Sequence, residues 1–423
     1  MENRVVITGM GVCAPNGIGL DAFGQSLLNG TSGIRHQADL EALKFSCQIA
    51  GKPSLKNVNL NNYFSNVQLK DLDSTGVVYG VIAGKDAWKD AGLYENMESL
   101  DWDSGVVFGT GILGVDKFRE AIYKVDAGNV RRLGSTAVIQ TMASGISAYL
   151  GGMLGLGNQV TTNSSACSTG TEAILMGFER IKSKKAKRML VGSCSDSGPY
   201  VWGGFDAMRI LPRRYNDKPS EASRPMSASA MGFVPGSGAG ALVLESLESA
   251  KARGVKIYGE ILGGAVNSGG QRNGGSMTAS NNNAVIKCIQ NAISDSGIQA
   301  DAIDSINGHL TATTKDAIEI TNWGEALKRK GKDFPYINSF KSIFGHCLAA
   351  SGSIECVGTV LQFQHKKVFG NLNCEDLHPD IQKQVSRERV PLHTIDFESK
   401  IIAKASFGFG DVNACVIFKS YSE

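Results

Sequence analysis

Residues 236–245 read Gly-Ser-Gly-Ala-Gly-Ala-Leu-Val-Leu-Glu, and residues 408–417 read Gly-Phe-Gly-Asp-Val-Asn-Ala-Cys-Val-Ile. In both places a glycine-rich turn leads into an apolar, strand-like run. Residues 257–264, Ile-Tyr-Gly-Glu-Ile-Leu-Gly-Gly, are in turn similar to the strand-like start of the chain. We interpret these similarities as a duplication with halves 1–254 and 255–423. Because glycine-rich turns before strands are common, unrelated strands are the alternative interpretation.

Outward from these stretches, short apolar runs alternate with segments of helical periodicity. Residues 5–8, 105–109 and 189–192 are apolar runs that end in or precede glycine, which is typical of strands buried on both faces. Residues 74–91 and 169–183 carry apolar side chains at helical spacing. This alternation predicts a layered α/β architecture.

Length and composition narrow the class of protein. The 423 residues exceed what one hydrophobic core usually supports, and 42% apolar with 20% charged residues is ordinary for a globular protein. A net charge of +3 gives no indication of nucleic-acid binding. The nine cysteines include no CxxC pair, which argues against a disulfide framework or structural zinc. The start of the chain lacks signal-peptide features and no apolar run approaches 18 residues, so we expect a cytoplasmic protein without a membrane span.

The chemistry is centred on residues 161–173, Thr-Thr-Asn-Ser-Ser-Ala-Cys-Ser-Thr-Gly-Thr-Glu-Ala. A strand-like stretch runs into small residues, and a helix is predicted to begin just after them. This junction places Cys167 at a helix N-terminus, where the exposed N–H groups and the helix dipole stabilise a thiolate. The same N–H groups can bind a developing oxyanion. The alternative is a buried structural cysteine, which is the more common role of this residue type.

Two of the six histidines support a catalytic interpretation. His309 and His346 each follow a strand-like run and a glycine, as does a side chain presented from a loop into a cleft. Together with Cys167 they predict a three-residue site assembled from distant parts of the chain. The other histidines stand in polar or charged segments and are expected at the surface: His36, His365, His378 and His393.

These motifs resemble those of the elongating β-ketoacyl-[acyl-carrier-protein] synthases of type II systems, of the synthase II kind, which have a thiolase fold. The likeness extends from residues 5–11 to residues 405–410. Its strongest elements are residues 166–170 (Ala-Cys-Ser-Thr-Gly), 223–225 (Ser-Arg-Pro), 232–240 (Gly-Phe-Val-Pro-Gly-Ser-Gly-Ala-Gly), Lys341-Ser342 and Gly345-His346. The resemblance implies a duplicated five-layer αβαβα fold. Its N-terminal half would carry the nucleophilic cysteine and its C-terminal half both histidines.

The resemblance also implies a reaction. Cys167 would accept an acyl group as a thioester, malonyl-ACP (ACP, acyl carrier protein) would lose carbon dioxide, and the resulting enolate would attack that thioester. Neutral N–H groups of His309 and His346 would hold the malonyl thioester oxygen. The backbone N–H groups of Cys167 and Phe409 would hold the other oxyanion. No metal or organic cofactor is expected, because the thioester is the electron sink.

Further residues acquire roles only through the resemblance. Lys341 and Glu355 match an ion pair that orders the site, although a lone Lys or Glu is usually a surface charge. Thr311 and Thr313 match threonines that contact the phosphopantetheine arm. Phe407 and Phe409 match aromatic residues at the mouth of the acyl pocket, and the alternative for each is a plain core position.

Two kinds of partner are implied. The surface of ACP is acidic, so its docking needs basic residues near the cavity entrance, and an ordinary solvated face is the alternative for such residues. The candidates are Arg131, Arg132, Arg209, Arg213 and Arg214. The family likeness also implies a dimer whose interface includes the strand leading to Cys167, either a homodimer or a heterodimer with a related subunit.

The chain departs from the family pattern around the substrate. Leu310 replaces the usual glycine after the first histidine, and we expect it to move or narrow the pantetheine path. Asp411 and Val412 replace Gly-Thr after the Gly-Phe-Gly turn, which predicts a stiffer and more acidic loop. Residues 227–231, Ser-Ala-Ser-Ala-Met, replace an acidic pair. These changes favour a specialised polyene, polyketide or unusual-lipid pathway, with housekeeping fatty-acid elongation as the competing assignment.

Two other functions are alternatives. A chain-length-factor partner of a heterodimeric ketosynthase normally lacks the nucleophile, whereas Cys167 is present. A thiolase acting on coenzyme A thioesters needs a second cysteine near the C-terminus as base, and Cys415 lies inside a strand-like run instead.

Overall fold

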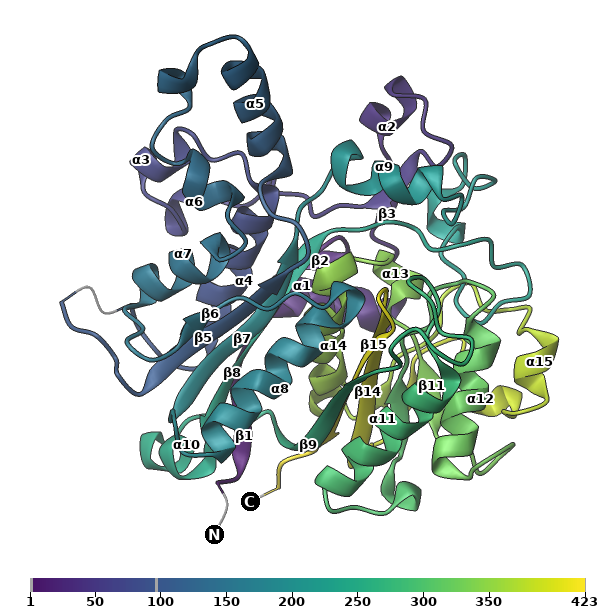
Figure 1. Ribbon diagram of the computed structural model, residues 1–423. Coiled ribbons are helices and arrows are strands. Elements are labelled where there is room, and N and C mark those ends of the chain that lie inside the picture. The colour runs from purple at the N-terminus through teal and green to yellow at the C-terminus, as the bar shows by residue number, and fades with distance from the viewer. Residues whose placement is uncertain (1–2, 96–97, 423) are drawn as a thin grey trace.

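A computed structural model describes residues 3–95 and 98–422 of the chain. A central sheet of eleven strands runs through the molecule (Figure 1). From one edge to the other its order is β11 (Tyr336–Asn338), β10 (Ser305–Asn307), β14 (Ile401–Gly408), β15 (Val412–Lys419), β9 (Gly259–Ser268), β1 (Val5–Ala14), β8 (Gly238–Ser246), β7 (Arg188–Ser195), β5 (Ser104–Thr110) and β6 (Val160–Thr161), with β2 (Gly17–Ile18) paired to β1. The sheet contains the three strands predicted from apolar runs, at residues 5–8, 105–109 and 189–192, so these predictions are confirmed.

The sheet consists of two sets of strands with the same order and directions. In β6-β5-β7-β8-β1 and in β11-β10-β14-β15-β9, the first two pairings are parallel and the last two antiparallel. The two glycine-rich stretches form the equivalent strands β8 and β15. An antiparallel pairing of Val5–Ile7 with Gly259–Ile261 joins the sets into one sheet. The duplicated architecture is confirmed, whereas the domain boundary between residues 254 and 255 stays a prediction.

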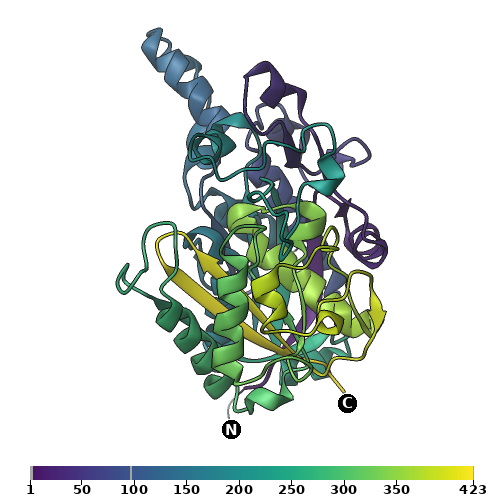
Figure 2. The same cartoon turned by 90° about the vertical axis from the view of Figure 1, so that its right-hand side faces the viewer.

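Helices complete five layers around the folded sheet (Figures 1 and 2). Between its two halves lie α8 (Thr169–Lys182) and α14 (Ser351–His365), which share the largest core cluster with both sets of strands. The outer face of the N-terminal set is covered by α4 (Thr75–Asp90) and α7 (Gly145–Leu154), and that of the C-terminal set by α11 (Asn282–Asp295) and α12 (Asp316–Leu327). The predicted helices at residues 74–91 and 169–183 are confirmed as α4 and α8.

The two central helices approach each other closely at their N-terminal ends. A Cβ atom on Gly170 would lie 2.4 Å from the backbone nitrogen of Ser353, and one on Gly352 would lie 2.6 Å from that of Thr171. Every residue of α14 up to Phe363 is buried, because sheet or helix covers it on all sides. Cys167 precedes α8 and His346 precedes α14. The close approach of these two helices therefore brings the nucleophile region and the second histidine together.

Smaller elements surround this frame. They are α1 (Leu20–Asn29), β3 (Ile34–His36), α2 (Ala38–Ala42), β4 (Ile49–Gly51), α3 (Asn66–Leu69), α5 (Val115–Asp126), α6 (Ala137–Thr141), α9 (Pro199–Ala207), α10 (Leu247–Arg253), α13 (Lys341–Phe344), β12 (Lys367–Val368), α15 (Pro379–Gln382) and β13 (Ile395–Asp396). Figure 2 shows α5 projecting from the rest of the molecule. Within residues 3–95 and 98–422, no helix is both long and apolar enough to span a membrane.

Candidate active site

Cys167 lies in a single 3₁₀ turn (Ala166–Ser168) that leads directly into α8. Ala166 has a φ of 49°, an uncommon conformation for a residue with a side chain, so the chain turns sharply at this point. Gly408 permits β14 to come close, because a Cβ there would be 3.1 Å from the Cys167 nitrogen. Burial raises the pKa of the Cys167 thiol, and the backbone N–H of Phe409 and the charge of Lys341 oppose that rise. Backbone donors are therefore already directed at the sulfur.

The structure brings Cys167, His309 and His346 together. The cysteine sulfur and one ring nitrogen of each histidine all lie within 4.8 Å of one another. The two imidazoles are nearly perpendicular, with ring centroids 5.5 Å apart. His309 follows the strand β10, as expected. The strand expected before His346 is wrong, because residues 341–344 form the helix α13, which ends at Gly345 with a φ of 77° that suits glycine. A thiol and two imidazoles are also zinc-ligand types, so metal analysis belongs with any activity measurement.

The contacts of His346 determine which of its ring nitrogens faces the cavity. The backbone N–H of Leu348 donates to His346 Nδ1 at 3.1 Å, and Ser351 Oγ lies 2.8 Å from the same atom. Because a backbone N–H is always a donor, Nδ1 must accept, and the proton of the neutral ring resides on Nε2. The Nε2–H group is thus available to donate to a substrate oxygen.

Two carboxylates hold the loop that carries His309. Glu319 accepts the backbone N–H of His309 at 2.7 Å and that of Leu310 at 2.8 Å. Asp316 accepts those of Thr311 and Ala312. Both acids lie in the first turn of α12 and are buried. Burial raises the pKa of the Glu319 carboxyl to about 7. The sequence analysis did not predict that Asp316 and Glu319 bind the His309 loop. The pattern that could have indicated it is the Asp-x-x-Glu at the start of a helix just after the histidine.

A buried ion-pair network lies behind the histidines. Lys341 Nζ pairs with one oxygen of Glu355, as the resemblance implied. Lys404 Nζ lies 2.9 Å from the other oxygen of Glu355, and none of the three side chains is more than 1% exposed. Lys404 was missed in the sequence. Its signal was a charged residue in the middle of the apolar run 401–406, because an unpaired lysine is almost never fully buried.

The electrostatic surroundings favour neutral imidazoles. Burial lowers the pKa of His309 and of His346 well below the ordinary value, and the positive charges of Lys341 and Lys404 lower both further. A neutral ring carries a single N–H group. At neutral pH both histidines therefore act as neutral hydrogen-bonding groups.

Two cavities meet at Cys167. An entrance cavity of about 440 Å³ is lined by Cys167 and both histidines, and also by Thr311, Thr313, Phe407 and Phe409. An inner cavity of about 140 Å³ extends past the sulfur between Ile112, Val201, Phe205 and Ala349. Phe409 lines both cavities. A thioester on Cys167 would have its acyl chain on one side of Phe409 and its incoming partner on the other.

Comparison with known families accounts for this geometry. Residues 2–250 match the family described as beta-ketoacyl synthase, N-terminal domain, and residues 258–375 match beta-ketoacyl synthase, C-terminal domain. The chain belongs to the beta-ketoacyl synthase family. The two matched segments meet near the boundary of the two strand sets, and the first contains Cys167 while the second contains both histidines.

Individual beta-ketoacyl synthases are similar over the whole chain. The 3-oxoacyl-[acyl-carrier-protein] synthase 2 of Vibrio harveyi is 33% identical over 428 residues, which cover 100% of both chains. The crystal structure of a beta-ketoacyl synthase from Burkholderia phymatum STM815 superposes with a TM-score of 0.89 at 28% identity, covering 99% of this chain and 100% of that chain. A structure of a type II polyketide acyl-carrier protein in complex with its ketosynthase gives 0.87 at 26% identity, with both chains covered completely.

The departures from the beta-ketoacyl synthase pattern affect the site differently from our expectation. Leu310 does not line the entrance cavity, because its side chain is fully buried in the core cluster beside α12. Its φ of 20° turns the side chain inward where glycine is usual. Asp411 is also fully buried, and its carboxylate accepts the N–H groups of Gln271 at 3.0 Å and Asn281 at 2.8 Å. It connects the Phe409 loop to residues 269–281 and does not present its charge to the cavity.

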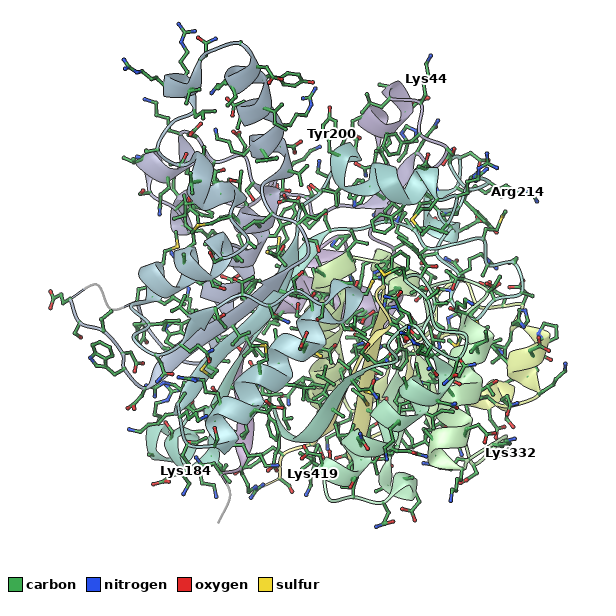
Figure 3. The ribbon with its side chains drawn as sticks, in the orientation of Figure 1. Lys44, Lys184, Tyr200, Arg214, Lys332 and Lys419 are labelled. Atoms are coloured by element: carbon green, nitrogen blue, oxygen red, sulfur yellow. The ribbon has the colours of Figure 1, made fainter. Side chains whose placement is uncertain are left out.

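The arginines proposed for carrier-protein docking are exposed but do not form one group. Arg209, Arg213 and Arg214 follow α9, next to Met208 and Ile210 of the entrance cavity. Arg131 and Arg132 follow α5, and Figure 3 shows Arg214 on the far side of α9 from that helix. Within one subunit, only the first group is adjacent to the entrance.

Proposed function

We propose that this beta-ketoacyl synthase catalyses a decarboxylative Claisen condensation between an acyl group on Cys167 and malonyl-ACP. The observation that carries the proposal is the arrangement of Cys167 Sγ and one ring nitrogen of each histidine within 4.8 Å, where two cavities meet. The names of its relatives support ACP as the carrier of the acyl groups. The products are a β-ketoacyl-ACP, one carbon dioxide and the free enzyme.

In the first half-reaction, the Cys167 thiolate attacks the acyl-ACP thioester. The backbone N–H groups of Cys167 and Phe409 stabilise the oxyanion, and the ACP thiol leaves with the proton that Cys167 gave up. In the second, the bond between malonyl and its carboxylate breaks and the electron pair moves to the thioester oxygen. His346 Nε2–H and a ring N–H of His309 hold that oxygen. The enolate carbon then attacks the Cys167 thioester and releases the thiolate.

Other residues support this chemistry. We assign to Lys341 and Glu355 the ordering of the histidine region, because their ion pair is fully buried behind it. Thr311 and Thr313 line the entrance cavity with their hydroxyl oxygens 3.1 Å apart, which suits the amide groups of a phosphopantetheine arm. Phe409 lines both the entrance cavity and the inner acyl cavity and separates them, and Phe407 lines the entrance cavity beside it.

We also propose the partners and the cellular setting. Arg209, Arg213 and Arg214 receive the acidic surface of ACP beside the entrance, and Arg131 and Arg132 act from a second subunit, since they lie away from this entrance. The subunits associate as a homodimer or with a related chain, through the edge strand β6.

A cytoplasmic location accords with nine free cysteines, all within the described residues. A specialised polyene, polyketide or unusual-lipid pathway is proposed from the sequence departures at Leu310, Asp411 and Val412 alone, since Leu310 and Asp411 do not line the entrance cavity.

Nothing in the site favours the two other functions. A chain-length-factor subunit has no use for a nucleophile supplied with backbone donors, and Cys167 has them. The thiolase function needs a second cysteine in the cavity, but Cys415 is fully buried in β15, within the outer core cluster.

Intact-mass spectrometry tests the proposal. Wild-type protein and Cys167→Ala are incubated with acyl-ACPs of several lengths and then with malonyl-ACP. The expected result is acyl mass on the wild type only, followed by its transfer into β-ketoacyl-ACP. A folded wild-type protein that accepts no acyl group, or one acylated by acyl-coenzyme A and not by acyl-ACP, would contradict it.

A further inference from the structure

Lys404 is a charged residue at the centre of a buried strand. It stands in β14 between Ala403 and Ala405, and its side chain has no exposed surface. A lysine usually extends its ammonium to water along its aliphatic stem. Here Nζ remains inside, 2.9 Å from Glu355 Oε2 and 3.0 Å from Ser406 Oγ, and it also donates to the Ala405 carbonyl.

Lys404 adds a second positive charge to the buried ion pair of Lys341 and Glu355. Lys341 pairs with Oε1 of Glu355 and Lys404 with Oε2, so two ammonium groups share one carboxylate. Lys341 and Glu355 alone would form a neutral pair, so among these three side chains the net positive charge comes from Lys404. Glu319, whose negative charge also acts on Lys341, is protonated below about pH 7 and does not offset that charge there. Removing charge from water costs several kcal/mol per ion, and apolar replacements of buried ion pairs are often more stable. A surplus buried charge therefore requires an explanation other than stability.

The nearest chemistry is that of the two histidines. Lys341 belongs to α13, Glu355 to α14 and Lys404 to β14, and these elements come together behind His309 and His346. The other charged side chains facing His309 are Glu319 and Asp316 on α12, which bind the backbone of its loop. The positive charge of Lys404 disfavours a proton on either ring.

We propose that Lys404 is a positioning residue of the condensation site, whose ammonium fixes Glu355 against Lys341 and supplies the surplus positive charge beside His309 and His346. This inference rests on the condensation proposed above. The charge has two consequences that act together. It keeps both rings neutral, and it favours the negative charge that develops on the oxygen they bind.

A proton on either ring would hinder the reaction for a definite reason. An imidazolium would form an ion pair with the malonyl carboxylate and stabilise the ground state that must lose carbon dioxide. On His346 the added proton would also be placed on Nδ1, directly against the N–H of Leu348. Loss of Lys404 should consequently lower activity most at mildly acidic pH.

The test compares three substitutions at this position with one elsewhere. Lys404→Met removes the charge, Lys404→Gln removes the charge but can still hydrogen-bond to Ser406, and Lys404→Arg retains the charge. Lys117→Met removes another buried lysine, which pairs with Asp71 and Asp73 away from the site. Turnover with acyl-ACP and malonyl-ACP is measured from pH 6 to pH 9. Alkylation of Cys167 by iodoacetamide reports whether the nucleophile region is intact.

We expect the ratio of turnover at pH 6 to that at pH 8 to fall about tenfold or more in Lys404→Met and Lys404→Gln, because a nearby charge commonly changes protonation equilibria by such factors. Lys404→Arg and Lys117→Met should keep the wild-type ratio, and the KM for malonyl-ACP at pH 8 should change little. A wild-type ratio in either neutral variant, with Cys167 alkylated normally, would overturn the inference.

A measurement without substrate separates this inference from the proposed function. The six histidine rings are labelled with carbon-13 and titrated by NMR in wild type and in whichever neutral variant folds. Two rings that remain neutral down to low pH in the wild type should titrate at higher pH in the variant. Unchanged titrations would overturn the role of Lys404, whereas a wild type that fails to condense any acyl group would overturn only the function.

Discussion

At the scale of single residues, His346 shows how backbone contacts assign a role to a side chain. Its Nδ1 accepts the N–H of Leu348, so Nε2–H is the group left for substrate. The acyl-thioester oxyanion, in contrast, would be bound by backbone N–H groups. In the proposed mechanism, the backbone N–H groups serve both attacks on a thioester carbonyl, whereas the histidines serve only the decarboxylation of the malonyl group.

This separation leads to a prediction for the histidines. His309→Ala and His346→Ala should each reduce condensation about 10²- to 10³-fold, the typical effect of removing one oxyanion donor. Acylation of Cys167, followed by intact mass, should continue in both variants. Equal loss of acylation and condensation would contradict the assignment of donors.

Glu319 gives a prediction for stability. Its pKa is raised by burial to about 7 from an ordinary 4.5, so the folded protein binds the proton more tightly than the unfolded chain does. The stabilisation from the protonated form is complete below pH 4.5 and is lost as the pH rises through about 7. The midpoint temperature of thermal unfolding should therefore fall more between pH 5 and pH 8 in the wild type than in Glu319→Gln, because the glutamine side chain does not titrate. The same pH dependence in both would contradict it.

At the residue scale, the sequence predicted which side chains come together where local context is distinctive, and it missed residues whose contacts are distant; the catalytic roles stay predictions. Cys167, His309 and His346 each stand beside small residues or glycine, and the structure brings them together. Lys404 and Glu319 act through partners in other elements, such as Glu355 and the His309 backbone, and no local pattern states those pairings. Leu310 misled because its position beside His309 does not reveal that the side chain turns into the core.

At the scale of elements, α8 and α14 pack closely enough to exclude a side chain at Gly170. Gly170→Ala would place a Cβ 2.4 Å from backbone, which cannot shift as a flexible side chain can. We expect a loss of about 1–3 kcal/mol in unfolding free energy, the usual cost of overpacking. Gly152→Ala is the matched control, since no atom lies within 4 Å of its added Cβ in α7. That variant should be as stable as the wild type or more so. Chemical denaturation compares them, and equal losses in both would refute the packing argument.

The loop after β14 allows a second prediction at this scale. Asp411 accepts two backbone N–H groups from residues 269–281, and Asn at this position would direct an N–H group at one of them. Leaving a buried donor unpaired costs about 1–3 kcal/mol, so the Phe409 loop should hold its N–H less firmly on Cys167. Acylation of Cys167 in Asp411→Asn should slow about tenfold in a mass-spectrometric time course. The exposed Asp396→Asn should acylate at the wild-type rate.

Periodicity predicted α4, α8 and several buried strands but not α14, and the repeated glycine-rich turn indicated two similar halves. It did not predict that β1 pairs with β9, because Val5 and Ile261 are far apart in sequence and both strands read as ordinary buried ones. Strand pairing depends on the arrangement of the whole chain.

At the scale of the whole molecule, the edge strand β6 is free on one side. On its far side from β5, β6 has no strand partner among the residues the structure describes. Exposed apolar side chains lie on and beside it, including Val160 of β6 itself and Trp102, which lies against Gly157. Ile112, which lines the inner cavity, is 56% exposed, so a single subunit leaves that cavity partly open. Exposed apolar surface of this kind is typical of an interface.

We therefore predict a dimer at micromolar concentration by light scattering. Val160→Glu should shift the protein toward monomer and reduce acyl transfer, because the inner cavity would lose its cover. Val67→Glu, at an exposed valine on α3, should remain dimeric. A monomeric wild type, or a dimer unaffected by Val160→Glu, would contradict this interface.

The pairing of β1 between β8 and β9 also constrains how the molecule is made. A ribosome releases β1 first, yet its long partner strands begin at Gly238 and Gly259. At about 5–20 residues per second, the apolar N-terminal strand waits roughly 10–50 s before either partner emerges. During translation the nascent chain thus exposes an incomplete sheet, and we expect its yield in cells to depend on chaperones that shield the first strand until its neighbours have been synthesised.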